Sequence, residues 1–170
     1  MTMHLIVDGY NLIRQSSQLQ TLDALDLQAG REALLELLTR YRQRSHHQVT
    51  VVFDGWQGGD LHESRDRYHD ILIIYSRRGE RADEVIKRLL RQERQRALVV
   101  TSDRDIQVCA DQVKAAWINA GQFESHLHEP AGMPEPEGEG NATAGSARKK
   151  GPARRLPKSR RRLRHRWQKL

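Results

Sequence analysis

The chain has 170 residues, of which 37% are hydrophobic and 30% are charged, and its formal net charge at pH 7 is +7. This length accommodates one folded domain with an appendage, and a single cysteine, Cys109, excludes an intramolecular disulfide. No apolar run reaches the roughly 20 residues of a membrane helix. The N-terminus also lacks the pattern of a signal peptide, so we expect a cytoplasmic protein without membrane association.

Five short apolar runs before residue 121 predict strands, and segments with one apolar face predict helices between or after them. The strands are expected at residues 4–7, 49–54, 71–75, 97–103 and 114–120. The helices are expected at residues 26–44, 80–95, 105–112 and 121–128, with Asp26 as an N-cap and Cys109 buried. Residues 55–70 are polar and contain three glycines near their start, which favours a loop. Continuous apolar strands alternating with helices are typical of a parallel sheet covered on both faces, so residues 1–128 are predicted to be an α/β domain with a mainly parallel five-stranded sheet.

The chain changes character after this domain. Residues 129–147 are rich in Pro, Gly, Ala and Glu and predict a disordered linker. Residues 148–170, the basic tail, hold 12 of the 29 Lys and Arg residues and no Asp or Glu, which leaves 17 basic against 22 acidic residues in the rest of the chain. Such an arm is typical of polyanion binding, and we expect contact with RNA or the ribosome, with a nonspecific role in solubility as the alternative. The tail residues expected to bind are Arg148, Lys149, Lys150, Arg154, Arg155, Arg160, Arg161, Arg162, Arg164 and Arg166.

Three of the predicted strands end in aspartate, at Asp8, Asp54 and Asp103. In an open parallel sheet the functional crevice lies outside the carboxyl ends of the strands, and we expect the strand at 4–7 to lie centrally beside that at 97–103. Each acid, taken alone, is also explained as a helix cap or a turn residue. Taken together, gathered carboxylates repel one another, and a fold tolerates them most readily when a cation neutralises them. Hard oxygen ligands suit Mg²⁺ or Mn²⁺.

Four motifs carry a resemblance to a known family: IVDGYNLI, VVFDG, GERADEVI and VVTSDRDI. In this order they resemble the NYN family of PIN-like nucleases, in its YacP-like branch, over about residues 3–128. The resemblance implies a PIN-like three-layer α/β/α fold and a metal-dependent ribonuclease that uses Mg²⁺ or Mn²⁺. It implies catalytic roles for Asp8, Asn11, Asp83 and Asp103, metal binding by the three acids among them, and outer metal positions for Asp54 and Asp105. Supporting roles are expected for Glu80 and Ser102.

We therefore predict an endoribonuclease for single-stranded RNA, either mRNA or another RNA, with the ribosome as one setting. It would use a metal-activated water and leave a 5′-phosphate and a 3′-hydroxyl. The alternatives are a non-catalytic RNA- or ribosome-binding module, and a metal-dependent DNA or flap nuclease or a phosphatase. No small-molecule cofactor is expected. Trp56 is expected to stack on an RNA base, with ordinary packing as the equal alternative. Phosphate contacts near the site are expected from Arg65, Arg67, Arg77 and Arg78.

Overall fold

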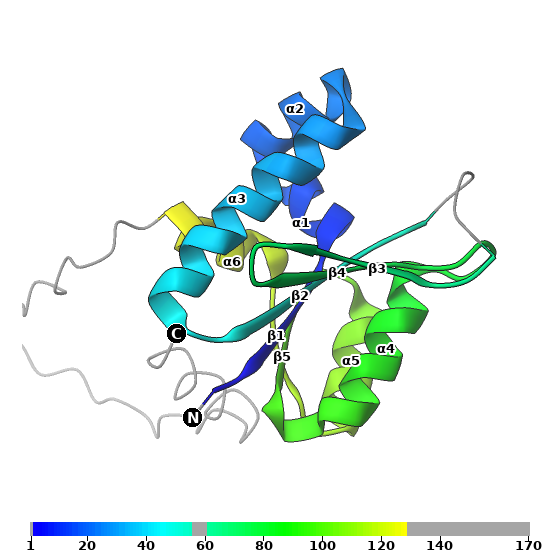
Figure 1. Ribbon diagram of the computed structural model, residues 1–170. Helices are drawn as coiled ribbons and strands as arrows, with labels where there is room; N and C mark the ends of the chain where they lie inside the picture. The colour runs from blue at the N-terminus through cyan, green and yellow to red at the C-terminus, as the bar shows by residue number, and fades with distance from the viewer. Residues whose placement is uncertain (1, 56–60, 129–170) are drawn as a thin grey trace, which may run out of the picture. The chain divides into compact units, whose positions relative to one another are not determined.

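A computed structural model describes residues 2–55 and 61–128, and within these residues a single sheet carries helices on both faces (Figure 1). The strands are β1 (His4–Asp8), β2 (Gln48–Phe53), β3 (Ser64–Tyr68), β4 (Ile71–Tyr75), β5 (Ala97–Val100) and β6 (Ala116–Ile118). Their spatial order is β3-β4-β2-β1-β5-β6. Every neighbouring pair is parallel except β3 with β4. The mainly parallel three-layer α/β/α architecture is therefore confirmed, as is the central place of β1 beside β5.

Two groups of helices cover the two faces of the sheet (Figure 1). The helical segments are α1 (Gly9–Gln15), α2 (Ser17–Leu25), α3 (Leu27–Ser45), α4 (Ala82–Glu93), the 3₁₀ turn η1 (Arg94–Arg96), α5 (Arg104–Gln112) and α6 (Ala120–His128). Helices α1, α3 and α6 pack together on one face, with α2 against α3, and helices α4 and α5 pack together on the other. None of these helices is long and apolar enough to cross a membrane.

The core follows from strands that are apolar along both sides. Ile6 and Val7, which are neighbours in β1, are both fully buried, because each lies under a different helical layer. The layer of α4 and α5 contains Val85, Ile86 and the thiol of Cys109, which confirms the buried cysteine. The strands are thereby fixed in register, and their carboxyl ends meet at one edge of the sheet, which we call the carboxyl edge.

The segment expected to be a loop over residues 55–70 contains a strand. Residues Ser64–Tyr68 form β3, which pairs antiparallel with β4 at the border of the sheet. The sequence Ser-Arg-Asp-Arg-Tyr hides this strand, because its three central residues are exposed and it is held by backbone pairing rather than by a buried side. Charged side chains of this kind also discourage pairing with another chain.

Two helices between β1 and α3 were also not predicted. Helix α1 begins directly at Gly9, with Asp8 as its N-cap. The turn after Asp8 is therefore the first turn of a helix, and Gly9 is needed there for space, because a Cβ atom would lie 2.3 Å from Cε1 of Phe53. Helix α2 follows through the cap of Ser16, whose hydroxyl accepts from the backbone of Leu19. Its residues Leu22 and Leu25 are exposed, so no clear apolar stripe marks it in the sequence.

Candidate active site at the carboxyl edge

Asp8 stands at the centre of the carboxyl edge, where β1 passes into α1. Its Oδ1 accepts from the backbone N–H of Asn11 at 3.4 Å, and its Oδ2 accepts from the hydroxyl of Thr101 at 3.4 Å. Burial is the main cause that raises the pKa of Asp8 to about 6, and the negative charges of Asp54 and Asp103 raise it further. The hydrogen bonds from Asn11 and Thr101 act in the opposite direction. Three acids from three strand ends therefore interact electrostatically here.

Asp103 follows β5 and caps helix α5. Its Oδ1 accepts from the backbone N–H groups of Asp105 at 2.8 Å and Ile106 at 3.3 Å. Its own backbone N–H donates to the Thr101 hydroxyl at 3.0 Å. Thr101 is fully buried. Its hydroxyl bridges the two acids, because it accepts from the backbone N–H of Asp103 and donates to the carboxylate of Asp8. Thr101 was not predicted from the sequence, although a hydroxyl two positions before an expected ligand was a signal for it.

Asn11 and Ser102 join the same two strand ends. The Asn11 side-chain oxygen accepts from the backbone N–H of Ser102 at 2.8 Å, which ties helix α1 to the segment before Asp103. Asn11 thus links two segments of the site, and its predicted catalytic role stays a prediction. The Ser102 hydroxyl oxygen is buried and finds no hydrogen-bond partner among the described residues. A buried hydroxyl without a partner, in the residue before Asp103, is suited to a bound ion or its water.

Asp54 and Asp83 both lie near the start of helix α4. Asp54 Oδ1 accepts from the backbone N–H of Ala82 at 2.5 Å, while the N-cap residue Arg81 caps the helix with no side-chain bond of its own. Asp54 therefore caps α4 from the neighbouring strand. Asp83, in the first turn of α4, forms ion pairs with Arg81 Nε at 3.6 Å and with Lys87 Nζ at 3.7 Å. Asp83 lies at this edge, but Asp54 rather than Asp83 is among the charges that act on Asp8.

The donor set fits a hydrated hard cation better than a closed cage. Among residues 2–55 and 61–128, no group of three or more His, Cys, Asp and Glu side chains is gathered tightly enough to enclose a metal ion. Mg²⁺ in proteins commonly uses one or two carboxylates and keeps several waters. Asp8, with Asp54 and Asp103 acting on its charge, offers this chemistry, and the unpartnered Ser102 hydroxyl belongs to the residue before Asp103.

The other residues predicted for the site lie outside this centre. Glu80 is largely buried and pairs with Arg88 Nη1 at 2.7 Å and Arg77 Nε at 3.6 Å, so it stabilises the start of α4. Arg65 pairs with Glu63 at 3.0 Å. Arg65 and Arg77 are thus engaged by acids, a pairing that competes with phosphate. Three further predicted residues are exposed: Asp105, Arg67 and Arg78. Trp56, the linker and the basic tail lie outside the described residues, so those predictions stay predictions.

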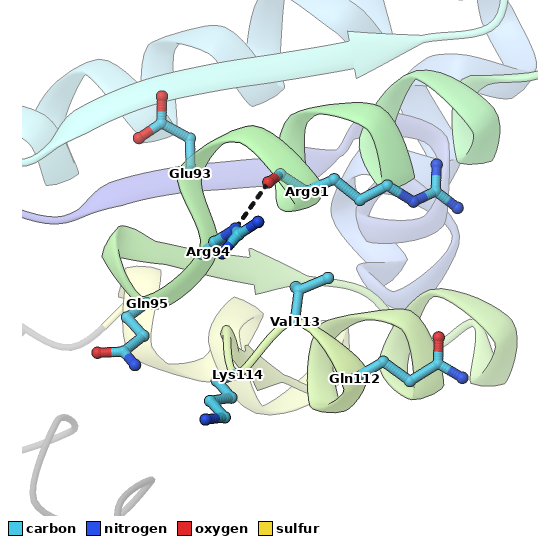
Figure 2. A pocket seen from close by; sticks show the side chains of 7 residues that line it. All are labelled: Arg91, Glu93, Arg94, Gln95, Gln112, Val113 and Lys114. Carbon is cyan, nitrogen blue, oxygen red and sulfur yellow. Dashed lines mark hydrogen bonds between the residues drawn. The ribbon is translucent and has the colours of Figure 1, made fainter.

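A cavity of about 650 Å³ lies away from the acids, where α4 and α5 end. Figure 2 shows its lining, which includes Arg91, Arg94 and Lys114. Arg94 and Lys114 have positive φ angles of 50° and 63°, as residues that leave helix ends often do. Cations at the C-terminal ends of two helices are explained by the negative ends of the helix dipoles. This cavity therefore contributes nothing to the chemistry at the carboxyl edge.

A mainly parallel α/β/α sheet with acids gathered at the ends of its central strands defines a PIN-like domain. The chain belongs to the YacP-like NYN domain family, whose family model matches residues 5–168. The match extends past the domain into the basic tail, further than the predicted residues 3–128. Membership of this family indicates a nuclease-type, RNA-related function.

Known relatives agree with this family. The uncharacterized protein YacP of Bacillus subtilis (strain 168) is 34% identical over 85 residues, which cover 50% of this chain and 49% of that protein. The chain therefore matches about half the length of this curated relative. A crystal structure of Rae1 (YacP) from Bacillus subtilis has a TM-score of 0.62 at 28% identity, covering 75% of this chain and 74% of that one. A mutant of the same protein gives 0.63 at 26% identity, covering 74% of this chain and 75% of that one.

Proposed function

We propose that the protein is a metal-dependent endoribonuclease that cleaves single-stranded RNA at the carboxyl edge, leaving a 5′-phosphate and a 3′-hydroxyl. The observation that carries the proposal is the placement of Asp8, Asp54 and Asp103 at or just after the carboxyl ends of the adjacent strands β1, β2 and β5, within a YacP-like NYN domain. The negative charges of Asp54 and Asp103 disfavour the ionised form of Asp8, so a cation bound among the three acids would relieve their repulsion. Their common use is to hold Mg²⁺ or Mn²⁺, the metals that suit oxygen ligands and phosphate chemistry.

Each residue has a role that follows from its contacts. Asp8 and Asp103 are the first residues proposed to hold the metal, with Asp54 at the third strand end. When bound, Mg²⁺ or Mn²⁺ supplies an activated water and neutralises charge on the scissile phosphate. Thr101 and Asn11 keep the two acid-bearing segments at a fixed distance through their hydrogen bonds. Such positioning matters because small displacements of reacting groups slow catalysis severely.

Asp83 and the basic tail extend the proposal. Asp83 joins the metal set only if it leaves its ion pairs with Arg81 and Lys87, which hold it in the described state. The basic tail recruits RNA, free or on the ribosome, through contacts with phosphates that need no folded structure. A non-catalytic binding module is a poorer explanation, because gathered acids repel the phosphates of a bound strand.

The experiment that tests the proposed function is cleavage by the purified full chain. Labelled single-stranded RNA and single-stranded DNA of the same sequence are incubated with protein in Mg²⁺, Mn²⁺ or EDTA. We expect RNA cleavage that needs metal and is lost in Asp8→Asn and Asp103→Asn, with 5′-phosphate ends on the downstream fragments. Cleavage that persists in EDTA, or in both variants, overturns the proposal. Preferential cleavage of the DNA favours the DNA-nuclease alternative.

A further inference from the structure

An arginine beside the acids is held by three aromatic rings. Arg31, on helix α3, places its guanidinium carbon 5.5 Å from the ring centre of Tyr10, 5.6 Å from that of Phe53 and 5.7 Å from that of Tyr75. The rings also contact each other, because Tyr10 meets Phe53 edge-on at 5.2 Å and Phe53 stacks with Tyr75 at 5.8 Å. We call Arg31 with these three rings the arginine cluster.

The arginine cluster lies at the carboxyl edge, next to the proposed metal site. Phe53 and Tyr75 are the last residues of the adjacent strands β2 and β4, and they are partners in the sheet register. Tyr10 lies in the first turn of α1, two residues after Asp8. The Phe53 ring also lies directly against Gly9, whose added Cβ would be 2.3 Å from it. One aromatic ring therefore separates the Arg31 guanidinium from the backbone next to the central acid.

The Arg31 guanidinium is held in place, but only some of its N–H groups donate hydrogen bonds within the domain. Its Nε donates to the Tyr10 hydroxyl at 2.8 Å, and its Nη2 donates to the same oxygen. Two of the five N–H donors are thus used, and three remain for a ligand. Within residues 2–55 and 61–128, no carboxylate forms an ion pair with Arg31, in contrast to Arg65 and Arg77. Helix α3 bears another arginine, Arg40, which does pair with an acid, Glu36.

The Arg31 guanidinium has the charge and the shape to bind a phosphate. A planar guanidinium held on aromatic faces keeps its fork oriented, and such a fork matches two oxygens of a phosphodiester. A strand with one phosphate over the acids places its neighbouring phosphates along the same edge. We propose that Arg31 binds the backbone phosphate next to the one that is cleaved, on the β2–β4 side of the site. The substrate class, a single-stranded RNA, rests on the proposed nuclease function.

The test measures RNA binding separately from cleavage. The full chain is titrated with labelled single-stranded RNA in EDTA over a series of salt concentrations, for wild type, Arg31→Met, Arg31→Lys and Arg40→Met. For Arg31→Met we expect about tenfold weaker binding and a plot of log K against log salt that is shallower by about 0.7, the value for one phosphate on a single strand. Arg31→Lys keeps the charge and the slope but binds more weakly, because it loses the fork. Arg40→Met removes an exposed, paired charge from the same helix and leaves both quantities unchanged.

A purely structural role for Arg31 lowers the melting temperature without changing the salt slope. An unchanged slope in a folded Arg31→Met protein overturns the inference, and so does an equal loss of slope in Arg40→Met. If Arg31→Met does not fold, RNA affinity is measured for Arg31→Lys and for Tyr10→Phe. The second variant removes only the hydroxyl that orients the guanidinium. Unaltered affinity in both of these variants then overturns it. If the wild type binds RNA in this way but cleaves none in Mg²⁺ or Mn²⁺, the proposed function fails while the Arg31 contact stands.

Discussion

Replacing the central acid with its amide should stabilise the metal-free protein at neutral pH. The pKa of Asp8 rises from 3.8 to about 6 on folding, chiefly because the carboxylate is buried. The folded state therefore binds more protons than the unfolded chain between these values, and the contribution of Asp8 to stability is lost as pH rises from about 4 to about 6. Two pKa units correspond to roughly 3 kcal/mol, as an upper bound. Asp8→Asn should recover part of this, about 1–3 kcal/mol at pH 7.5.

The amide is a close substitute for the acid in every other respect. Asn caps helices about as well as Asp, so the start of α1 is retained. Stability is measured by urea denaturation in EDTA at pH 7.5 and pH 4, where the advantage of Asp8→Asn should disappear. Asp105→Asn serves as the control, since this exposed acid in the first turn of α5 favours the helix dipole and its loss costs a few tenths of a kcal/mol. A variant Asp8→Asn that is no more stable than wild type at pH 7.5, or equally more stable at both pH values, would refute the reasoning.

Three further substitutions test separate contacts. Thr101→Val removes the buried hydroxyl between the two acid-bearing segments and should cost about 1–3 kcal/mol in urea denaturation; a neutral effect would show that the bridge is not needed. Gly9→Ala puts a methyl group into the Phe53 ring and should cost about 1–3 kcal/mol, whereas full stability by thermal melting would contradict the contact. Lys87→Met frees Asp83 from one of its ion pairs, so the concentration of Mg²⁺ that raises the melting temperature should fall if Asp83 joins the metal set. An unchanged Mg²⁺ midpoint would remove Asp83 from it.

The strands and the acids at their ends were predictable because they depend on short stretches of sequence. A continuous apolar run implies a strand covered on both faces, and the residue after it must reach the carboxyl edge whatever the rest of the fold does. Asp8 and Asp103 were therefore located without knowledge of any contact between them. The same logic failed for β3, because an edge strand that is held by backbone pairing imposes little pattern on its side chains.

The contacts that arrange the site were not predictable, since each joins distant segments or depends on a choice among nearby partners. The hydroxyl of Thr101 donates to Asp8 from a position 93 residues away. Its place two residues before Asp103 does not identify Asp8 as its partner. Asp83 could turn toward the strand ends or toward Arg81 and Lys87, and its place in the helix allows both directions. The pattern of apolar strands thus determines which residues reach the carboxyl edge. The charged side chains around each carboxylate determine which way it turns. A bound divalent cation alters that balance directly, because it attracts every nearby carboxylate more strongly than a single lysine does.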